Sequence, residues 1–185
     1  MKNVMLAGAV VLAMAASAYA QGAGRATSTK ATAGKATADH HFVMDVATVN
    51  TAEVELGKLA TDKASNDQVK KFGQRMVDDH TKAGDELKTL AQQKNITLPT
   101  DLDAKHKAVR DRLTKLSGEG FDRAYMQEMV SGHRQAVMKF RTAAKSGKDP
   151  EIKEWAAKTL PTIEEHLKQA QGIARGVVGT TGTKK

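Results

Sequence analysis

The sequence contains no cysteine, and this absence excludes several kinds of site and one kind of anchor. Without thiols the protein has no disulfide bonds, no thiolate metal ligands and no cysteine nucleophile. Because no cysteine follows the first apolar segment, the lipid anchor of bacterial lipoproteins is excluded as well. The stability of the fold therefore has to come from the packing of its side chains.

Other common patterns are missing too. No apolar run reaches the length of about 20 residues that a membrane-spanning helix needs. No segment of the mature chain alternates with the period of two that marks a half-buried strand. No Ser/His/Asp or phosphate-loop signature points to a metal-free enzyme. We therefore expect an all-α protein without a transmembrane span in its mature form.

The first twenty residues have the pattern of a signal peptide. Lys2 supplies the positive charge, residues 4–16 are apolar or small, and Ala18-Tyr19-Ala20 offers the small-x-small motif that a signal peptidase cleaves. The pattern predicts a signal peptide over 1–20, a mature chain that starts at Gln21, and a location in the periplasm or cell envelope.

The ends of the mature chain differ in composition from its middle. Residues 21–38 lack large apolar side chains and predict a flexible basic linker, and residues 176–185 predict a disordered tail. The formal net charge is +8 and becomes +7 when Lys2 is removed with the signal peptide. We expect the basic tails to meet anionic envelope surfaces, and we expect no nucleic-acid partner because the protein is exported. The folded domain is predicted over 39–175.

Helix start and stop signals divide this domain into five helical segments. The start signals are Asp39 for the first segment, Ser65 with Gln68 for the second, Thr100 with Asp103 for a short third segment over 101–116, and Asp149-Pro150 for the last. Ser117-Gly118 breaks the third segment, and the fourth helix follows it. Gly147 is a natural stop for the fourth helix.

Four of the predicted helices are long and amphipathic, about 25 to 29 residues each, which is typical of a four-helix bundle. The segment over 101–116 spans roughly 24 Å as a helix. That length suffices for a crossover helix between the second and third long helices, which predicts a ferritin-like four-helix bundle. A simple up-down-up-down bundle with a helical insert is the alternative.

One polar residue interrupts the apolar face of each long helix. These residues are Glu53, His80, His133 and His166. All four lie near the middle of their helices, and their distances from the turns differ by about three residues, or roughly 4.5 Å along the axis. We therefore expect the four side chains to meet inside the bundle.

One carboxylate and three imidazoles suit a divalent metal, namely Zn²⁺, Cu²⁺ or non-haem iron. Asp79 flanks the second apolar face and is predicted to orient a ligand histidine from outside the site. Met76 and Met129 lie one turn before two of the histidines, which suits copper but is also ordinary core packing. The alternative for the whole layer is a hydrogen-bonded network that sets helix register and binds no metal. His106 also lies on an apolar face, without an obvious partner.

Several motifs resemble one bacterial family, the domain of unknown function 4142. They are Ala52-Glu53-Val54-Glu55-Leu56-Gly57-Lys58-Leu59-Ala60, Met76-Val77-Asp78-Asp79-His80-Thr81, Leu116-Ser117-Gly118, Phe121-Asp122-Arg123-Ala124-Tyr125-Met126, the His133 region, Leu160-Pro161 and His166-Leu167. The resemblance runs from about residue 39 to 174. Members of this family often carry the label outer membrane protein. The resemblance implies a ferritin-like bundle in the periplasm or envelope and supplies no established activity.

The chain departs from the ferritin-like di-iron pattern, which needs a Glu-x-x-His pair on two helices. Val77, Val130 and Ile163 stand three residues before the three histidines, and this argues against ferroxidase or iron-storage chemistry. Three functions stay open. They are a metal-binding envelope protein, a structural or stress-related envelope protein without metal, and a histidine-ligated metalloenzyme.

Overall fold

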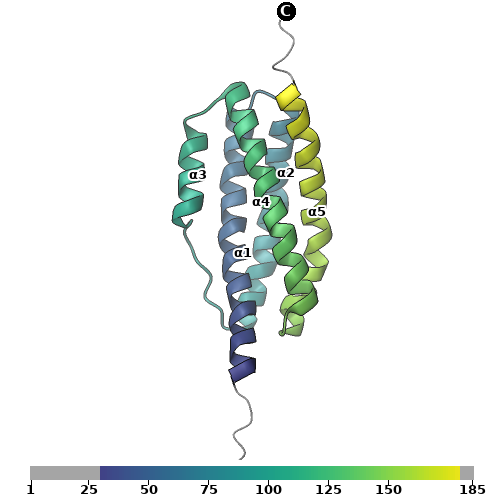
Figure 1. Cartoon of the computed structure of the whole chain (residues 1–185). Helices are drawn as coiled ribbons and strands as arrows, with labels where there is room; N and C mark the ends of the chain where they lie inside the picture. Colours follow the sequence, from purple (N-terminus) through teal and green to yellow (C-terminus); the bar gives the residue numbers. More distant parts are fainter. Residues whose placement is uncertain (1–29, 180–185) are drawn as a thin grey trace, which may run out of the picture.

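The computed structural model describes the backbone of residues 30–179 and the side chains of residues 38–177. Within this part the chain forms five α-helices and no strand, which confirms the all-α prediction (Figure 1). The helices are α1 (Lys30–Lys63), α2 (Asp67–Gln93), α3 (Ala104–Thr114), α4 (Gly118–Ser146) and α5 (Pro150–Gly179). The predicted signal peptide, residues 21–29 of the predicted linker and the last residues of the predicted tail lie outside the described residues.

The helical domain extends past the predicted limits of 39–175. Helix α1 begins at Lys30, inside the segment predicted as a linker. Helix α5 continues to Gly179, and Val177 is buried in the core with 6% of its surface exposed. Apolar burial at Val177 explains why this end of α5 is part of the packed domain.

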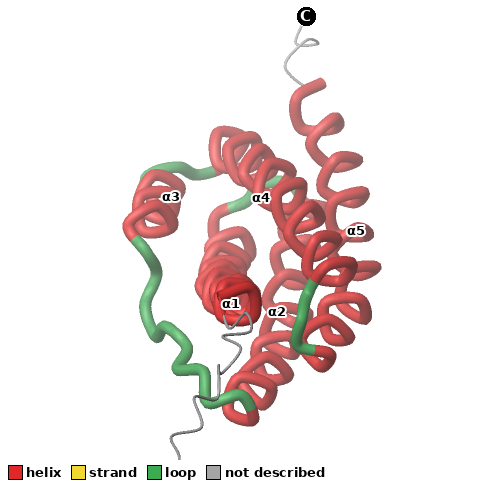
Figure 2. The backbone as a smooth tube through the Cα atoms, turned by 60° about the horizontal axis from the view of Figure 1, so that its bottom comes forward, coloured by secondary structure: helices red, strands yellow, loops and turns green. Residues whose placement is uncertain are grey.

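The four long helices form two hairpins, α1 with α2 and α4 with α5. Between the hairpins, the chain runs back along the bundle through an extended stretch and then α3, so that α2 and α4 point in the same direction (Figure 1). Viewed toward the lower end of the bundle, the four long helices surround a common interior, and α3 lies outside them beside α1 and α4 (Figure 2). The crossover prediction is therefore confirmed, and the up-down-up-down alternative is excluded.

The crossover helix is shorter than predicted. It starts at Ala104 because Asp103 is its N-cap, with a side chain that accepts a hydrogen bond from the His106 backbone at 2.8 Å. Residues 96–103 are not helical, and Pro99 in this stretch disfavours a helix before it. The predicted start at Thr100 is therefore wrong.

Two other predicted start signals have different roles in the structure. The N-cap of α2 is Asn66, whose side chain accepts from the backbone of Gln68 and Val69. Ser65 instead donates its hydroxyl to Asp122 on α4, at 2.6 Å. The prediction of a Ser65 capping box is wrong, because the serine hydroxyl is used by a contact between helices that lie far apart in sequence.

Asp39 does not cap α1 either. Its carboxylate is buried and accepts hydrogen bonds from the backbone N–H groups of Lys148 and Asp149, each at 2.7 Å, in the turn between α4 and α5. Asp122 does the same at the other end of the bundle, where it accepts from the backbone of Ser65 and Asn66. Each hairpin thus holds the turn of the other hairpin through one buried carboxylate.

The signals around the last turn agree with prediction. Gly147 ends α4, and the Asp149 side chain accepts from the backbone of Glu151 and Ile152 at the start of α5. These local caps place the two helices of the second hairpin in an antiparallel arrangement.

The core consists of two apolar clusters, one at each end of the bundle. The first includes Phe72, Met76, Phe121, Tyr125 and Ile173, and the second includes Val43, Leu87, Phe140, Trp155 and Ile163. Burying each large apolar side chain contributes about 1.5–3 kcal/mol to stability. On every long helix, the polar residue singled out above lies between the residues of the two clusters. The bundle therefore contains a polar layer between two apolar layers.

Candidate metal centre

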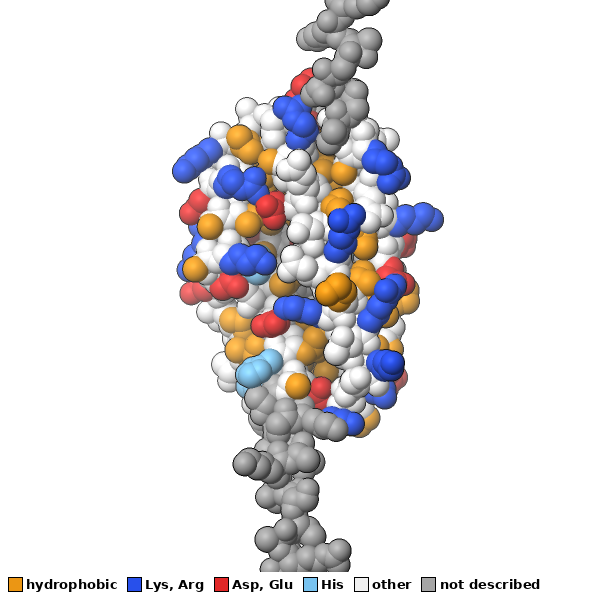
Figure 3. All heavy atoms as spheres, viewed as in Figure 1, with side chains coloured by type: hydrophobic (Ala, Val, Ile, Leu, Met, Phe, Trp, Pro, Cys, Tyr) orange, Lys and Arg blue, Asp and Glu red, His pale blue; other side chains and the backbone are white. Residues whose placement is uncertain are grey.

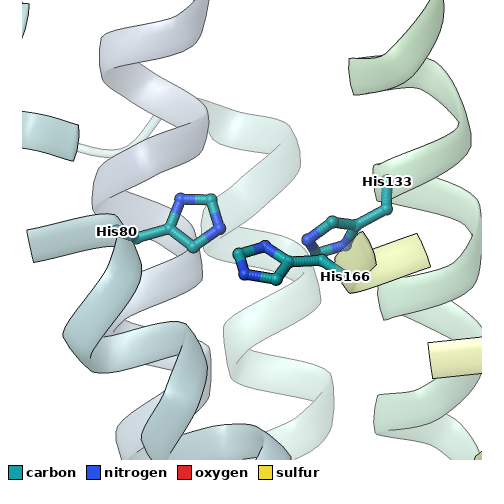
Figure 4. A group of neighbouring side chains, drawn as sticks. All are labelled: His80, His133 and His166. Atoms are coloured by element: carbon teal, nitrogen blue, oxygen red, sulfur yellow. The ribbon is translucent and has the colours of Figure 1, made fainter. Parts of the chain in front are cut away.

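Three of the four predicted residues meet in the polar layer. His80 on α2, His133 on α4 and His166 on α5 turn their rings toward one another in the interior (Figure 4). They are 6%, 1% and 1% exposed, and one ring nitrogen of each lies within 4.8 Å of one nitrogen of each of the others. Nitrogens that bind one ion at 2.0–2.1 Å are roughly 3.3–3.6 Å apart. The rings are therefore close to a coordinating arrangement.

Each of the three rings uses one nitrogen in a hydrogen bond to a neighbouring oxygen. The pairs are His80 Nδ1 with Asn50 Oδ1 at 3.0 Å, His133 Nδ1 with the Met129 carbonyl at 2.8 Å, and His166 Nε2 with Asp79 Oδ2 at 2.7 Å. Since all three partners are acceptors, each neutral ring donates its N–H there. This fixes the tautomer and leaves the lone pair on the remaining nitrogen, as in metal-binding histidines.

The remaining nitrogens have no partner among the described residues. They are His80 Nε2, His133 Nε2 and His166 Nδ1, all fully buried. Folded proteins rarely leave buried polar atoms unsatisfied, and here three lone pairs occur in one layer. A cation that accepts those lone pairs would satisfy all three atoms at once. The residues present therefore fit a metal ion held by three nitrogens.

Burial favours the neutral form of His80 and His166. The pKa of His80 is lowered to about 3, mainly by burial and in addition by the neighbouring His133 and His166. Burial also lowers the pKa of His166, although the hydrogen bond to Asp79 opposes that effect. Neutral imidazole is the form that binds metal ions, so both rings are ready to coordinate at neutral pH.

Asp79 is in the position predicted for it. Its carboxylate accepts the His166 hydrogen bond and another from Arg75 Nε at 3.1 Å. Burial alone would raise the pKa of Asp79, but the hydrogen bonds from His166 and Arg75 outweigh burial and the pKa is lowered. An ionised Asp79 orients the His166 ring and increases its basicity.

Glu53 lies beside the three histidines and is not part of their nitrogen group. Its Oε1 atom is 3.9 Å from His133 Nδ1, the ring nitrogen that already donates to the Met129 carbonyl. Its Oε2 atom is buried without a hydrogen-bond partner, and burial raises the pKa of this carboxyl. The structure thus brings Glu53 next to one ring, near the nitrogen that the Met129 carbonyl already holds.

Asn50, which was not among the residues predicted from the sequence, is an α1 side chain that hydrogen-bonds to the histidine layer. Besides the bond to the His80 ring, its Nδ2 donates to the His80 carbonyl at 2.7 Å. Gly84 makes room for this contact, because a Cβ at position 84 would lie 2.6 Å from Asn50 Nδ2. Its spacing could have identified it in the sequence, because Asn50 stands three residues before Glu53 and therefore lies on the same side of the helix.

The other candidates from the sequence lie outside the histidine layer. His106 is half-buried, and its Nδ1 atom lies 2.7 Å from the side chain of Asp103, the N-cap of α3. Met76 and Met129 are fully buried in the first apolar cluster, one turn before His80 and His133 on their helices. Both methionines are therefore core residues next to the layer.

Several solved structures share this fold. A DUF305 protein from Streptomyces coelicolor is 15% identical with a TM-score of 0.65, covering 76% of this chain and 92% of that one. A DUF305 fragment from Deinococcus radiodurans is 13% identical with a TM-score of 0.66, covering 74% and 95%. CopM in its Cu(II)-bound form is 19% identical with a TM-score of 0.63, covering 75% and 96%. A silver-bound form of CopM has a TM-score of 0.60 at 21% identity, with the same coverage. At these identities the likeness concerns the fold alone.

Three further findings concern membrane spans, curated relatives and the family. Within residues 30–179, no helix combines the length and apolar character needed to cross a membrane. The sequence matches no curated protein. It does match the family described as domain of unknown function (DUF4142) over residues 24–173, which is most of its length. The resemblance noted in the sequence is thereby confirmed, and the chain belongs to the DUF4142 family.

Proposed function

We propose that this protein binds one copper ion through His80, His133 and His166. The observation that carries the proposal is the group of three buried ring nitrogens without partners, each on a ring whose other nitrogen is held by an oxygen. Such outer hydrogen bonds are a regular feature of metal-binding histidines. A bound ion would satisfy all three nitrogens.

Copper is favoured over the other metals considered. Three neutral imidazoles form a site of intermediate softness, and among divalent first-row ions Cu²⁺ binds such sites most tightly. The likeness of the fold to CopM, which was solved with Cu(II) and with silver, supports the same choice. Iron is less suitable because no carboxylate belongs to the nitrogen group. Zn²⁺, which also binds imidazole, is the alternative that a binding experiment has to exclude.

The same proposal places the protein in the periplasm or cell envelope. The support is the signal-peptide pattern over 1–20, which predicts export. On the face shown in Figure 3, lysine and arginine side chains are spread among acidic and apolar ones rather than gathered into one basic patch. Attachment to anionic surfaces would then depend on the basic tails. The function we infer is the holding of copper outside the cytoplasm.

A layer that only sets helix register is the second candidate. The outer hydrogen bonds of His80 and His166 favour it, because both join different helices and would hold the bundle together without any ion. This candidate leaves the three inner nitrogens unsatisfied, whereas copper binding uses them. Metal titration separates the two candidates.

The test is the copper content of the purified mature chain. After equilibration with Cu²⁺ or Cu⁺ in the presence of an equal amount of Zn²⁺, and gel filtration, elemental analysis should find one copper per chain and no stoichiometric zinc. His133→Ala should abolish stoichiometric binding. The exposed His40 and His41 are the matched controls, and changing both to alanine should leave one copper bound. Substoichiometric copper in the wild-type chain, or binding unchanged by His133→Ala, would refute the proposal.

A further inference from the structure

The three histidines are buried, so an ion needs a way to reach them. A cavity of about 350 Å³ lies along the seam between α1 and α4, partly covered by α3. Its lining includes the buried residues Glu53, His80 and Trp155 and also the exposed residues Asp103 and Lys105. The cavity therefore connects the surface of the bundle with one ring of the histidine layer.

Helix α3 is held beside this seam by its fully buried Leu113, which packs in the first apolar cluster, and by two ion pairs. Arg110 contacts Glu55 on α1 at 3.5 Å, and Arg112 contacts Glu128 on α4. Because these pairs are partly exposed, each contributes at most about 1 kcal/mol. Helix α3 is therefore attached on both sides of the seam and forms one wall of the cavity.

The carboxylate inside the cavity is Glu53. Its side chain is only 8% exposed, and Oε2 has no hydrogen-bond partner. An unpaired carboxylate in such a place lowers stability unless a cation or a proton accompanies it. Its Oε1 atom lies 3.9 Å from His133 Nδ1, so an ion bound by Glu53 would already stand next to the histidine layer. His106 and Glu128 line the cavity closer to the surface.

We propose that this cavity is the entrance for the metal ion, and that Glu53 receives the ion there before the three histidines bind it. This inference rests on the proposed function, since it assumes that the histidines bind an ion. It gives Glu53 a role in the path of the ion rather than among its final ligands. In this step the ion only exchanges the carboxylate oxygen of Glu53 for the histidine nitrogens, and no covalent bond is made or broken.

Trp155 gives a direct signal for the test. It is the only tryptophan of the chain, and its side chain lines the cavity, so Cu²⁺ arriving there should quench its fluorescence. Stopped-flow mixing of the wild-type chain with Cu²⁺ then gives the rate of loading. Elemental analysis of the same samples at equilibrium gives the copper bound per chain.

Glu53→Gln should slow loading by about ten-fold or more, because the charge that attracts the cation into the cavity is lost. The copper bound at equilibrium should stay at one per chain. Asp62→Asn, at an exposed aspartate of the same helix, is the matched control and should load at the wild-type rate.

Gly132 offers an independent test, because a Cβ at this position would lie 3.7 Å from Glu53 Oε1, inside the cavity. Gly132→Leu should therefore obstruct the path and slow loading. Gly172 on α5 has nothing within 4 Å of its Cβ position, so Gly172→Leu is the matched control. If Gly132→Leu does not fold, Gly132→Ala, whose Cβ fits at ordinary contact distance, replaces it and should slow loading to a smaller degree.

The outcomes separate this inference from the proposed function. If the wild-type chain binds one copper but Glu53→Gln and the Gly132 variant load at the wild-type rate, the entrance lies elsewhere and the inference is overturned. If Glu53→Gln loses the copper at equilibrium, Glu53 is a permanent ligand, which overturns the inference as well. If the wild-type chain binds no copper, the proposed function has failed, and the equilibrium measurement shows this before any rate is compared.

Discussion

Asn50 contacts His80 twice, once at the ring and once at the backbone. Its Oδ1 atom is 3.0 Å from His80 Nδ1, and its Nδ2 atom donates to the His80 carbonyl at 2.7 Å. One amide on α1 therefore sets both the position and the tautomer of a histidine on α2. As a result, the Nε2 lone pair of His80 is directed away from Asn50 and is free for an ion.

We predict that Asn50→Ala weakens copper binding by about 10- to 100-fold, the usual effect of losing the partner of a ligand histidine. A titration in competition with a copper chelator measures the change. Thr51→Ala is the control, because among the described residues the Thr51 hydroxyl bonds only to the Ala47 carbonyl of the same helix. Equal affinities for the wild-type chain and Asn50→Ala would show that His80 does not need this contact.

Asp79→Asn should also weaken copper binding, by roughly ten-fold or more. The substitution keeps an oxygen acceptor but removes the negative charge that supports the His166 N–H and pairs with Arg75. The neighbouring Asp78 is exposed and bonds only Gln74 among the described contacts, so Asp78→Asn is the matched control. The same chelator titration applies, and an affinity loss that is equal in both variants would contradict the prediction.

The ion-free protein should lose stability as the pH falls below 6.5. In the folded state the pKa of His80 is lowered to about 3, so the unfolded chain takes up this proton first. The contribution of neutral, buried His80 to the stability of the folded state is fully present above pH 6.5 and is lost progressively as the pH falls to about 3. From pH 6.5 to pH 5 the loss is about 2 kcal/mol. His166, whose pKa is also lowered, acts in the same direction.

Glu53 acts in the opposite direction, because its raised pKa contributes stability at low pH that is lost as the pH rises above 4.5. Urea unfolding of the ion-free wild-type chain and of His80→Gln at pH 7 and pH 5 isolates the histidine. The stability of the wild-type chain should fall more between these pH values than that of His80→Gln. An equal fall in both proteins would mean that His80 is not kept neutral by burial.

Asp122→Ala should destabilise the bundle by about 3 kcal/mol. The substitution leaves two backbone N–H groups and the Ser65 hydroxyl without their charged acceptor, and hydrogen bonds to charged groups contribute about 1.5–3 kcal/mol each. Asp39→Ala should give a similar loss at the other end of the bundle, where two backbone N–H groups lose their acceptor. Urea unfolding measures both, with the exposed Asp111→Ala as control. A loss below about 1 kcal/mol for Asp122→Ala would show that the turn is held by other contacts.

Much of this protein was determined by local sequence. The helical period of 3.6 residues placed His80, His133 and His166 on inward faces, and the structure buries all three. Local chemistry also gave the turn at Gly147 and the cap at Asp149, because a helix end is decided by residues a few positions apart. The motifs that resemble the DUF4142 family include the positions of these three histidines.

Only the tertiary structure decided which side chains meet between helices. Periodicity tells which face of a helix a residue is on, but not which residue of a neighbouring helix lies at the same height. Asn50 rather than Glu53 therefore contacts His80, and the predicted caps Asp39 and Ser65 bond partners that are distant in sequence. The crossover through α3 was likewise decided by how the two hairpins pack, since either connection satisfies the same apolar faces.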